Sequence, residues 1–438
     1  MNVLVDPRLG LLTAVRRQPP QPGIPPGWIG YGAHVAATDR YDEHTVDRYG
    51  FGAALGDHDR ARRAAIGEAV ERYCGNIVPP GLRTASYREL RDSGANAIDP
   101  ARLALYSDAQ YALPGFPFTA FHGDLRVAWV PGTDLHSGDP VLVPASLAYL
   151  NYHVGARRGE PATNALSYAG IATGTDREHA ERFALEELFE RDATTLWWAG
   201  DDAAPLVADA DGLVARLDDP EADDRTVLIR QVPSPFGVPV MTAFLTDHRH
   251  RVIAFGSACR ADPRQAATKA LVEAFGLYAV TRKLLDPDSD VWYAVREGAV
   301  PGHVFRPYRA DRSYRDAFRD DWRDLVDLPA IAQLYLDPRM QGAPLDRLRD
   351  DSTTTTFDRI PAVPDDRARD TYLRRLAGAG LTAVSVDLTT SDVAAAGLRV
   401  VRVLVPGLYG NSPPAFPLLG GDRLPSGAHT GRPPIPLA

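Results

Sequence analysis

Two glutamates followed by an arginine occur twice in this chain, each time inside the same twelve-residue pattern, A-x-R-x-A-x-x-E-x-x-E-R. The charged residues that close the two copies are Glu68, Glu71 and Arg72, and Glu187, Glu190 and Arg191. Residues three and four apart share one face of a helix, so each copy points two carboxylates and an arginine the same way. Neighbouring carboxylates repel each other unless a cation lies beside them. The pattern therefore predicts a magnesium ion that holds phosphate groups.

A simpler reading of each copy is a solvated helix face. Glutamate followed four residues later by arginine is a common surface pair, which contributes about 0.2–0.5 kcal/mol to a helix. One copy alone would favour that reading. Because the pattern recurs with the same flanking alanine and arginine, we favour two related helices that face each other across a shared site.

Composition limits the classes of function. A length of 438 residues, with 45% hydrophobic and 24% charged residues, is typical of a globular enzyme with two or three cores. The net charge of -9 and the lack of a Lys/Arg-rich run argue against a nucleic-acid partner. No apolar run is long enough to span a membrane, and the N-terminus lacks a secretory signal. We expect a cytoplasmic protein without a membrane partner, in which Cys74 and Cys259 are reduced and buried.

The paired carboxylates must be positioned by helices. Aspartates that can cap a helix predict one helix from Asp57 or Asp59 to about Cys74 and another from about Asp176. A loop of small residues is expected before each helix, at 50–56 and 167–174, where backbone N–H groups could hold phosphate. Three strands, at 227–232, 238–245 and 252–258, should lead into a third helix over 263–282 that carries Glu273.

The remaining segments complete the expected organisation. We expect a strand at 3–7, an irregular stretch at 286–314, a mobile loop at 352–356 and a helix over 365–379. Two strands, 381–389 and 399–406, should form a crossover-like unit around a short helix. The predicted domains are a strand and proline-rich lead-in at 1–50, a catalytic domain at 50–410 and an extended Gly/Pro-rich tail at 411–438 that could thread a groove.

Several of these phrases resemble the YcaO family, and in particular its azoline-forming peptide cyclodehydratases. They are the doubled E-x-x-E-R pattern, Val386-Asp387-Leu388-Thr389, the run from Val403 to Leu408, and the terminal Pro434-Ile435-Pro436. The resemblance covers nearly the whole chain. It implies an α/β (α+β) fold with two pseudo-repeats of sheet plus signature helix around a central nucleotide site.

The resemblance also implies an activity. ATP and Mg2+ would be the cofactors, and the substrate would be a ribosomally made precursor peptide with a leader. A Cys, Ser or Thr side chain would attack the preceding carbonyl, ATP would phosphorylate the resulting oxyanion, and loss of phosphate would close a thiazoline or oxazoline. We expect a separate leader-binding partner protein, and association of the chain as a homodimer is compatible with the sequence.

Roles follow for the matching residues. Glu68, Glu71, Glu187 and Glu190 would bind the metal, and Arg72 and Arg191 would contact phosphate or order the glutamates. The nucleotide-binding set is these six residues together with Glu273, on the third helix. The residues expected to take part in catalysis are Glu71, Arg72, Glu190, Arg191, Pro434 and Pro436.

Some positions depart from the family pattern and leave alternatives open. Leu55 stands in place of a lysine, Ala64 in place of a serine, and His179 and Phe183 in place of polar residues. One alternative is a nucleotide-impaired scaffold or docking subunit for an active homologue. Another is an amide-activating enzyme that uses an external nucleophile and makes a thioamide or amidine.

Overall fold

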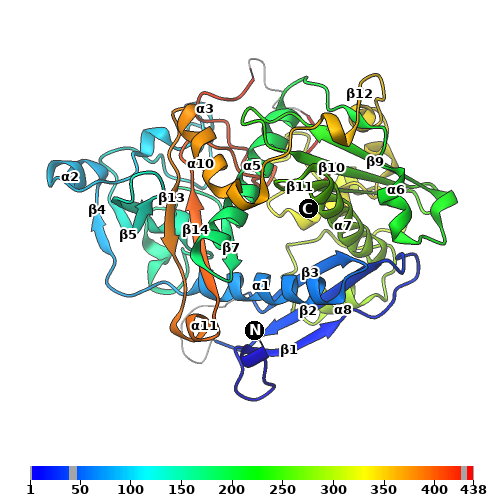
Figure 1. The fold of residues 1–438 in the computed structure, drawn as a ribbon, viewed down its shortest axis with the longest axis horizontal. Coiled ribbons are helices and arrows are strands. Elements are labelled where there is room, and N and C mark those ends of the chain that lie inside the picture. Colours follow the sequence, from blue (N-terminus) through cyan, green and yellow to red (C-terminus); the bar gives the residue numbers. More distant parts are fainter. Residues whose placement is uncertain (1, 39–46, 426–431, 438) are drawn as a thin grey trace.

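The structure is a computed structural model that describes residues 2–38, 47–425 and 432–437. In this part of the chain, three sheets are each followed by a long helix (Figure 1). The first unit is an antiparallel meander and its helix: β1 (Leu12–Arg17), β2 (Trp28–Val35), β3 (Tyr49–Leu55) and α1 (His58–Asn76). The sequence predicted α1 but none of these three strands, whose residues it assigned to the lead-in and to a glycine loop.

The glycines of β3 explain that error. A Cβ atom at Gly50 would lie 2.3 Å from the backbone nitrogen of Ala69, and one at Gly52 would lie 2.1 Å from that of Ala65. Real Cβ atoms do not approach so closely. The glycines therefore serve a strand that packs directly against α1, and do not form a phosphate-binding loop.

The second unit contains the six-stranded sheet, at the left of Figure 1. Its strands, in spatial order, are β4 (Arg83–Ala85), β5 (Val127–Asp134), β13 (Val384–Asp387), β14 (Arg399–Leu404) and β7 (Ile171–Gly174), and β6 (Pro140–Pro144) pairs with β5. The helix α5 (Arg177–Ala199) follows β7. The expected loop at 167–174 is thus partly a strand.

The connection between β13 and β14 also differs from the prediction. Both strands exist and α11 (Ser391–Ala395) joins them, but they pair antiparallel. A parallel crossover needs a connection of about a dozen residues or more, usually with a full helix. The short segment with α11 can only turn the chain back, so the crossover prediction was wrong.

The third unit lies at the right of Figure 1 and was predicted in outline. It consists of β9 (Arg225–Val232), β10 (Val240–Asp247), β11 (Val252–Cys259) and α7 (Pro263–Lys283). The short strands β8 (Leu206–Val207) and β12 (Thr354–Thr355) extend its sheet. Because β12 is hydrogen-bonded into a sheet, the expected mobile loop at 352–356 was wrong.

Short helices connect these units. They are α2 (Tyr87–Asp92), α3 (Asp108–Tyr111), α4 (Ala145–Ala148), α6 (Asp211–Val214), α8 (Asp290–Arg296), α9 (Pro329–Leu334) and α10 (Ala368–Gly378). The helix expected over 365–379 is α10, with a 3-10 turn before it. The stretch at 286–314 contains α8, and residues 2–4 form a 3-10 turn where a strand was expected.

The three long helices join the units in a cycle. Each packs on the last strand of its own unit and on a strand of another: α1 on β3 and β7, α5 on β7 and β11, and α7 on β11 and β3. Cys74 and Cys259 are buried and unpaired, as expected. Among the described residues, no helix combines the length and the apolar sequence needed to cross a membrane.

Candidate functional site

Each long helix begins at an aspartate and carries a glutamate at the same position. Asp57, Asp176 and Asp262 accept hydrogen bonds from backbone N–H groups of the first turn of α1, α5 and α7. The intervals to the first glutamate of the site, 57–68, 176–187 and 262–273, are equal. Glu68, Glu187 and Glu273 therefore occupy equivalent positions on their helices. The capping aspartates stabilise the first turns of these helices.

On α1, Glu68 and Arg72 form the first charged pair. A guanidinium nitrogen of Arg72 lies 3.0 Å from Glu68 Oε1, and the backbone N–H of Phe51 on β3 donates to Glu68 Oε2 at 3.3 Å. The Arg72 guanidinium also lies over the ring of Tyr168, 3.7 Å from its centre. Burial raises the pKa of Glu68, and Arg72 acts in the opposite direction. Arg72 is thus ordered by both a carboxylate and a ring.

Glu71 reaches from α1 into the second unit. Its Oε1 accepts a hydrogen bond of 2.7 Å from the backbone N–H of Thr173 on β7. Burial, and then the charges of Glu68 and Glu187, raise the pKa of Glu71 to about 8. The carboxyl is therefore held where its negative charge is poorly compensated, which a cation would correct.

The carboxylates of α5 repeat this arrangement. Glu187 accepts a hydrogen bond of 3.0 Å from the backbone N–H of Gly170, and Glu190 accepts one of 2.6 Å from the hydroxyl of Ser257 on β11. Arg191 lies 3.8 Å from Glu187 and 3.3 Å from Glu190. Burial raises the pKa of Glu190, although Arg191 lowers it. Glu71 thus links the first unit to the second, and Glu190 links the second to the third.

The third helix supplies Glu273 and closes the ring. Burial acts to raise the pKa of Glu273, but Lys269, with which it forms an ion pair, and Arg191 hold that pKa below its usual value. The indole N–H of Trp28 on β2 donates to the carbonyl of Val272 on α7 at 2.9 Å, which ties the third unit to the first. The seven charged residues predicted from the sequence therefore form one electrostatically connected group.

This donor set fits Mg2+ that arrives with a nucleotide. Mg2+ in such sites takes one or two carboxylates, with phosphates and water completing its shell. Among the described residues, no three His, Cys, Asp or Glu side chains form a ready-made metal cage. The raised pKa of Glu71 and the buried, unpaired Nε of Arg191 both leave capacity for a further ligand. Oxygen donors of this kind suit a Mg2+ ion whose shell is completed by phosphate better than they suit a metal ion bound by protein ligands alone.

The terminal prolines lie elsewhere. Pro434 and Pro436 are buried beside the C-terminal end of α5, where the Trp198 indole donates to the carbonyl of Pro433 at 2.9 Å and the Tyr335 hydroxyl to that of Pro434. These contacts do not bring them to the carboxylates. Residues 426–431 and Ala438 of the expected tail are outside the described part of the chain.

A different part of the C-terminal segment contacts α5 directly after the signature. Arg423 forms two hydrogen bonds, of 2.6 and 2.7 Å, to the fully buried carboxylate of Asp192. The backbone N–H of Tyr409 donates to the same carboxylate at 2.9 Å. Sequence reasoning missed this anchor, although Asp192 directly follows Arg191.

Two of the residues that depart from the family pattern, His179 and Phe183, are neighbours on α5. The rings of His179 and Phe183 lie with centres 4.5 Å apart, and the guanidinium of Arg260 lies 5.6 Å from the centre of the Phe183 ring. Leu55, at the end of β3, is buried. Apolar surface thus occupies positions where the family pattern has polar groups.

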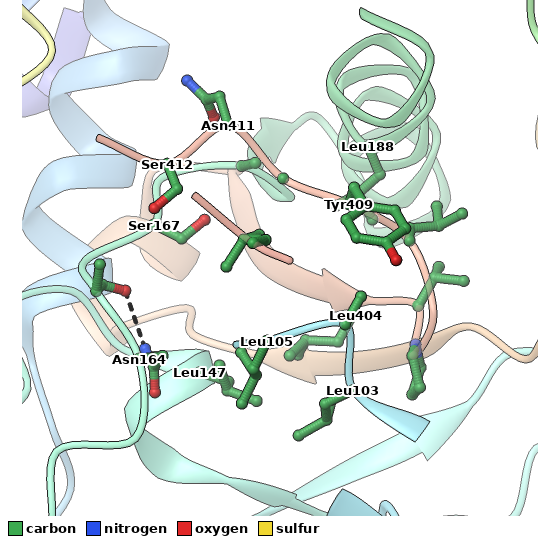
Figure 2. Close-up of a pocket in the computed structure, with 18 of the residues that line it drawn as sticks. Leu103, Leu105, Leu147, Asn164, Ser167, Leu188, Leu404, Tyr409, Asn411 and Ser412 are labelled. Carbon is green, nitrogen blue, oxygen red and sulfur yellow. Dashed lines mark hydrogen bonds between the residues drawn. The ribbon is translucent and has the colours of Figure 1, made fainter. Parts of the chain in front are cut away.

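A pocket of about 120 Å3 is lined in part by Ser167 and Ala169 of the 167–170 segment (Figure 2). Its apolar wall includes Leu103, Leu105, Leu147, Leu188, Leu404 and Tyr409, with Asn164, Ser167, Asn411 and Ser412 at its polar edge. The buried guanidinium of Arg402 donates to carbonyls in this wall, among them Leu147 and Ala169. Arg402 thereby fixes the segment that presents Tyr168 to Arg72 and Gly170 to Glu187.

Comparison with known proteins gives one family. The family model described as YcaO cyclodehydratase, ATP- and Mg2+-binding, matches residues 52–409. No curated protein matches the chain.

Solved structures of the same fold are similar over most of this chain. A heterocyclase in complex with substrate and cofactor has a TM-score of 0.63 and 21% identity, covering 93% of this chain and 51% of that one. YcaO from Methanopyrus kandleri, bound with AMPPCP and Mg2+, has 0.57 and 19%, covering 92% and 89%. The E. coli microcin synthetase McbBCD complex has 0.58 and 12%, covering 97% and 96%. The chain spans about half the length of the heterocyclase, and these likenesses confirm the predicted α+β fold.

Proposed function

Because the chain belongs to the YcaO family, as its sequence predicted, we propose that it is an ATP-dependent cyclodehydratase acting on a ribosomally made precursor peptide. ATP and Mg2+ are the ligands by which the family is described. In the proposed reaction a Cys, Ser or Thr side chain attacks the preceding backbone carbonyl, and the amide oxygen leaves as phosphate. The product is a thiazoline or oxazoline ring.

One observation supports this proposal above the others. Two carboxyls with raised pKa, Glu71 and Glu190, are held by Thr173 and Ser257 from neighbouring units. Such a cluster costs stability without a cation, which is typical of a site selected for ligand binding. ATP would supply the phosphoryl group that turns the amide oxygen into a leaving group, with Mg2+ on its phosphates.

The residues of the chain would bind and orient these ligands. Glu68, Glu71, Glu187 and Glu190 would hold the metal side of the nucleotide, with Glu273 facing them from α7. Arg72 and Arg191 are positioned to offset negative charge on the transferring group, because each is already ordered by a glutamate of its own helix. Positioning and electrostatics would then account for most of the rate enhancement.

The proposal includes a peptide substrate and a partner protein. One protein of this fold is described as a heterocyclase in complex with substrate and cofactor, and another as the microcin synthetase McbBCD complex. By analogy, we propose that a separate protein binds the leader of the precursor and delivers the peptide. The buried Pro434 and Pro436 would act by holding the C-terminal segment in place beside α5.

The test is reconstitution with the precursor peptide and partner encoded beside this chain. With Mg-ATP, mass spectrometry should show loss of one water for each ring formed, together with ADP and phosphate in equal amounts. A Glu190→Gln variant serves as the inactive control. If the intact set of proteins consumes no ATP and leaves the peptide mass unchanged, the proposed activity is wrong.

A second function is favoured by the apolar residues Leu55, Ala64 and Phe183. They are compatible with a scaffold or docking subunit that no longer binds nucleotide. Calorimetric titration with Mg-AMPPCP separates the two functions, since saturable micromolar binding excludes a subunit that no longer binds nucleotide. Product mass separates ring formation from the remaining alternative, because an external sulfide or amine would give a thioamide or amidine.

A further inference from the structure

The chain contains two lysines, Lys269 and Lys283, and both lie on α7. Lys283 is in the last turn and pairs with Asp290 at 2.7 Å. Lys269 lies one turn before Glu273 and forms an ion pair and hydrogen bond with it. One of the two lysines is therefore part of the charged site, and the other is not.

The position of Lys269 on its helix is shared by the other two long helices. The intervals from the capping aspartates, 57–64, 176–183 and 262–269, are equal. Lys269 thus stands on α7 where Ala64 and Phe183 stand on α1 and α5. The third unit supplies a cation at a position where the first two units supply apolar side chains.

Lys269 also faces the first unit. Its charge acts on Glu68 of α1 as well as on Glu273, and Glu68 and Glu273 act on each other. The ammonium is therefore paired with Glu273 on α7 and close enough to Glu68 on α1 for its charge to act on that carboxylate too. A compact charge on a flexible stem suits the terminal phosphates of a nucleotide as well as it suits a carboxylate.

Among the described residues, the neighbouring arginines have more protein partners than Lys269, which forms its ion pair with Glu273. Arg72 is held by Glu68 and the Tyr168 ring, and Arg260 by Glu186 at 3.3 Å and by a carbonyl. The Lys269 side chain keeps 31% of its surface accessible and that of Glu273 keeps 46%. Both members of this pair can therefore be reached by a ligand.

We propose that Lys269 is a phosphate-binding residue of this site, whose ammonium moves from Glu273 to the terminal phosphates of a bound nucleoside triphosphate. Glu273 holds the lysine in place until the nucleotide arrives, and is then free to face the metal. This assignment rests on the proposed function, because it takes the ligand to be Mg-ATP.

Selective acylation tests the assignment on the unmodified chain. The probe is an acyl phosphate of ATP, in which the acyl group is carried on the terminal phosphate. An amine beside that phosphate attacks the acyl carbon, the bond from acyl carbon to phosphate oxygen breaks, ATP leaves and the amine loses a proton. Mass spectrometry of the digested protein then shows which lysine carries the acyl group.

Lys269 should be acylated in the presence of Mg2+, and excess Mg-AMPPCP should suppress that labelling. Lys283 is the internal control, and its labelling should be weak and unchanged by the competitor. Labelling of Lys269 that does not exceed that of Lys283, or that the competitor leaves unchanged, would overturn the assignment.

Binding measurements give a second readout. Lys269→Met should weaken Mg-AMPPCP binding roughly tenfold or more, whereas Lys269→Arg and the matched control Lys283→Met should change it little. Equal affinity of Lys269→Met and the wild type would reject the proposal. If the wild type itself binds no Mg-AMPPCP, the proposed function fails first. If it binds but Lys269 stays unlabelled, only the role of Lys269 fails.

Discussion

The carboxyl of Glu71 gives the site a pH dependence that can be calculated. Its pKa is raised from 4.5 to about 8 in the folded chain. Between these values the folded state holds a proton that the unfolded state has lost, so stability falls as pH rises. Glu71→Gln keeps an oxygen that can accept the N–H of Thr173 and removes the titration. The variant should therefore be free of this loss.

The magnitude follows from the two pKa values. Each pH unit between them changes the free energy of unfolding by about 1.4 kcal/mol. From pH 6 to pH 9 the folded carboxyl passes through its pKa of about 8, and the loss over that interval is about 3 kcal/mol. Relative to the wild type, Glu71→Gln should gain that amount as pH rises, in the absence of nucleotide and Mg2+.

Urea denaturation at pH 6 and pH 9 measures the difference. The control is Glu178→Gln, which removes an exposed glutamate from α5 and leaves the buried charges unchanged. Its stability should run parallel to that of the wild type. If the Glu71→Gln profile is also parallel to the wild type, Glu71 titrates normally and the electrostatic reasoning for the site is refuted.

Four further predictions concern the site and its supports. Glu190→Gln should abolish turnover and leave the unfolding midpoint within a few degrees of the wild type; normal turnover would remove Glu190 from the site. Mg-ATP binding at pH 7 should release protons, seen as a dependence of the calorimetric heat on buffer ionisation, because a metal displaces the proton of Glu71. Asp192→Asn should cost about 3 kcal/mol of stability by leaving Arg423 without its buried partner, whereas Asp201→Asn, at an exposed pair, should cost less than about 1 kcal/mol. Gly52→Ala should destabilise the fold strongly, since its Cβ would lie 2.1 Å from Ala65, and Gly159→Ala, with open space around it, should not.

The sequence predicted what is local to a helix. Capping aspartates located α1 and α5, helical spacing located α7, and the doubled pattern identified six of the charged residues that the structure brings together. The equal interval from Asp262 to Glu273 was also present in the sequence and marks α7 as the third equivalent helix. These signals repeat with the period of the helix, so they can be found without tertiary information.

The remaining features depend on contacts between distant segments. The backbone N–H of Thr173 holds Glu71 and the hydroxyl of Ser257 holds Glu190, but neither a backbone group nor a serine in a strand carries a local mark of that role. Gly50 and Gly52 suggest a loop until α1 is seen to pack on them. The pairing of β13 with β14 is likewise set by the sheet and not by their own residues.

Anomalous diffraction from crystals grown with Mn2+ and AMPPCP tests the central claim most directly, because Mn2+ replaces Mg2+ and can be located by its own signal. A manganese peak bound to the nucleotide phosphates among the carboxylates of Glu68, Glu71, Glu187 and Glu190 is the predicted result. Nucleotide and metal bound at another place, with these glutamates still engaged only by Arg72, Arg191 and the strands, would contradict it.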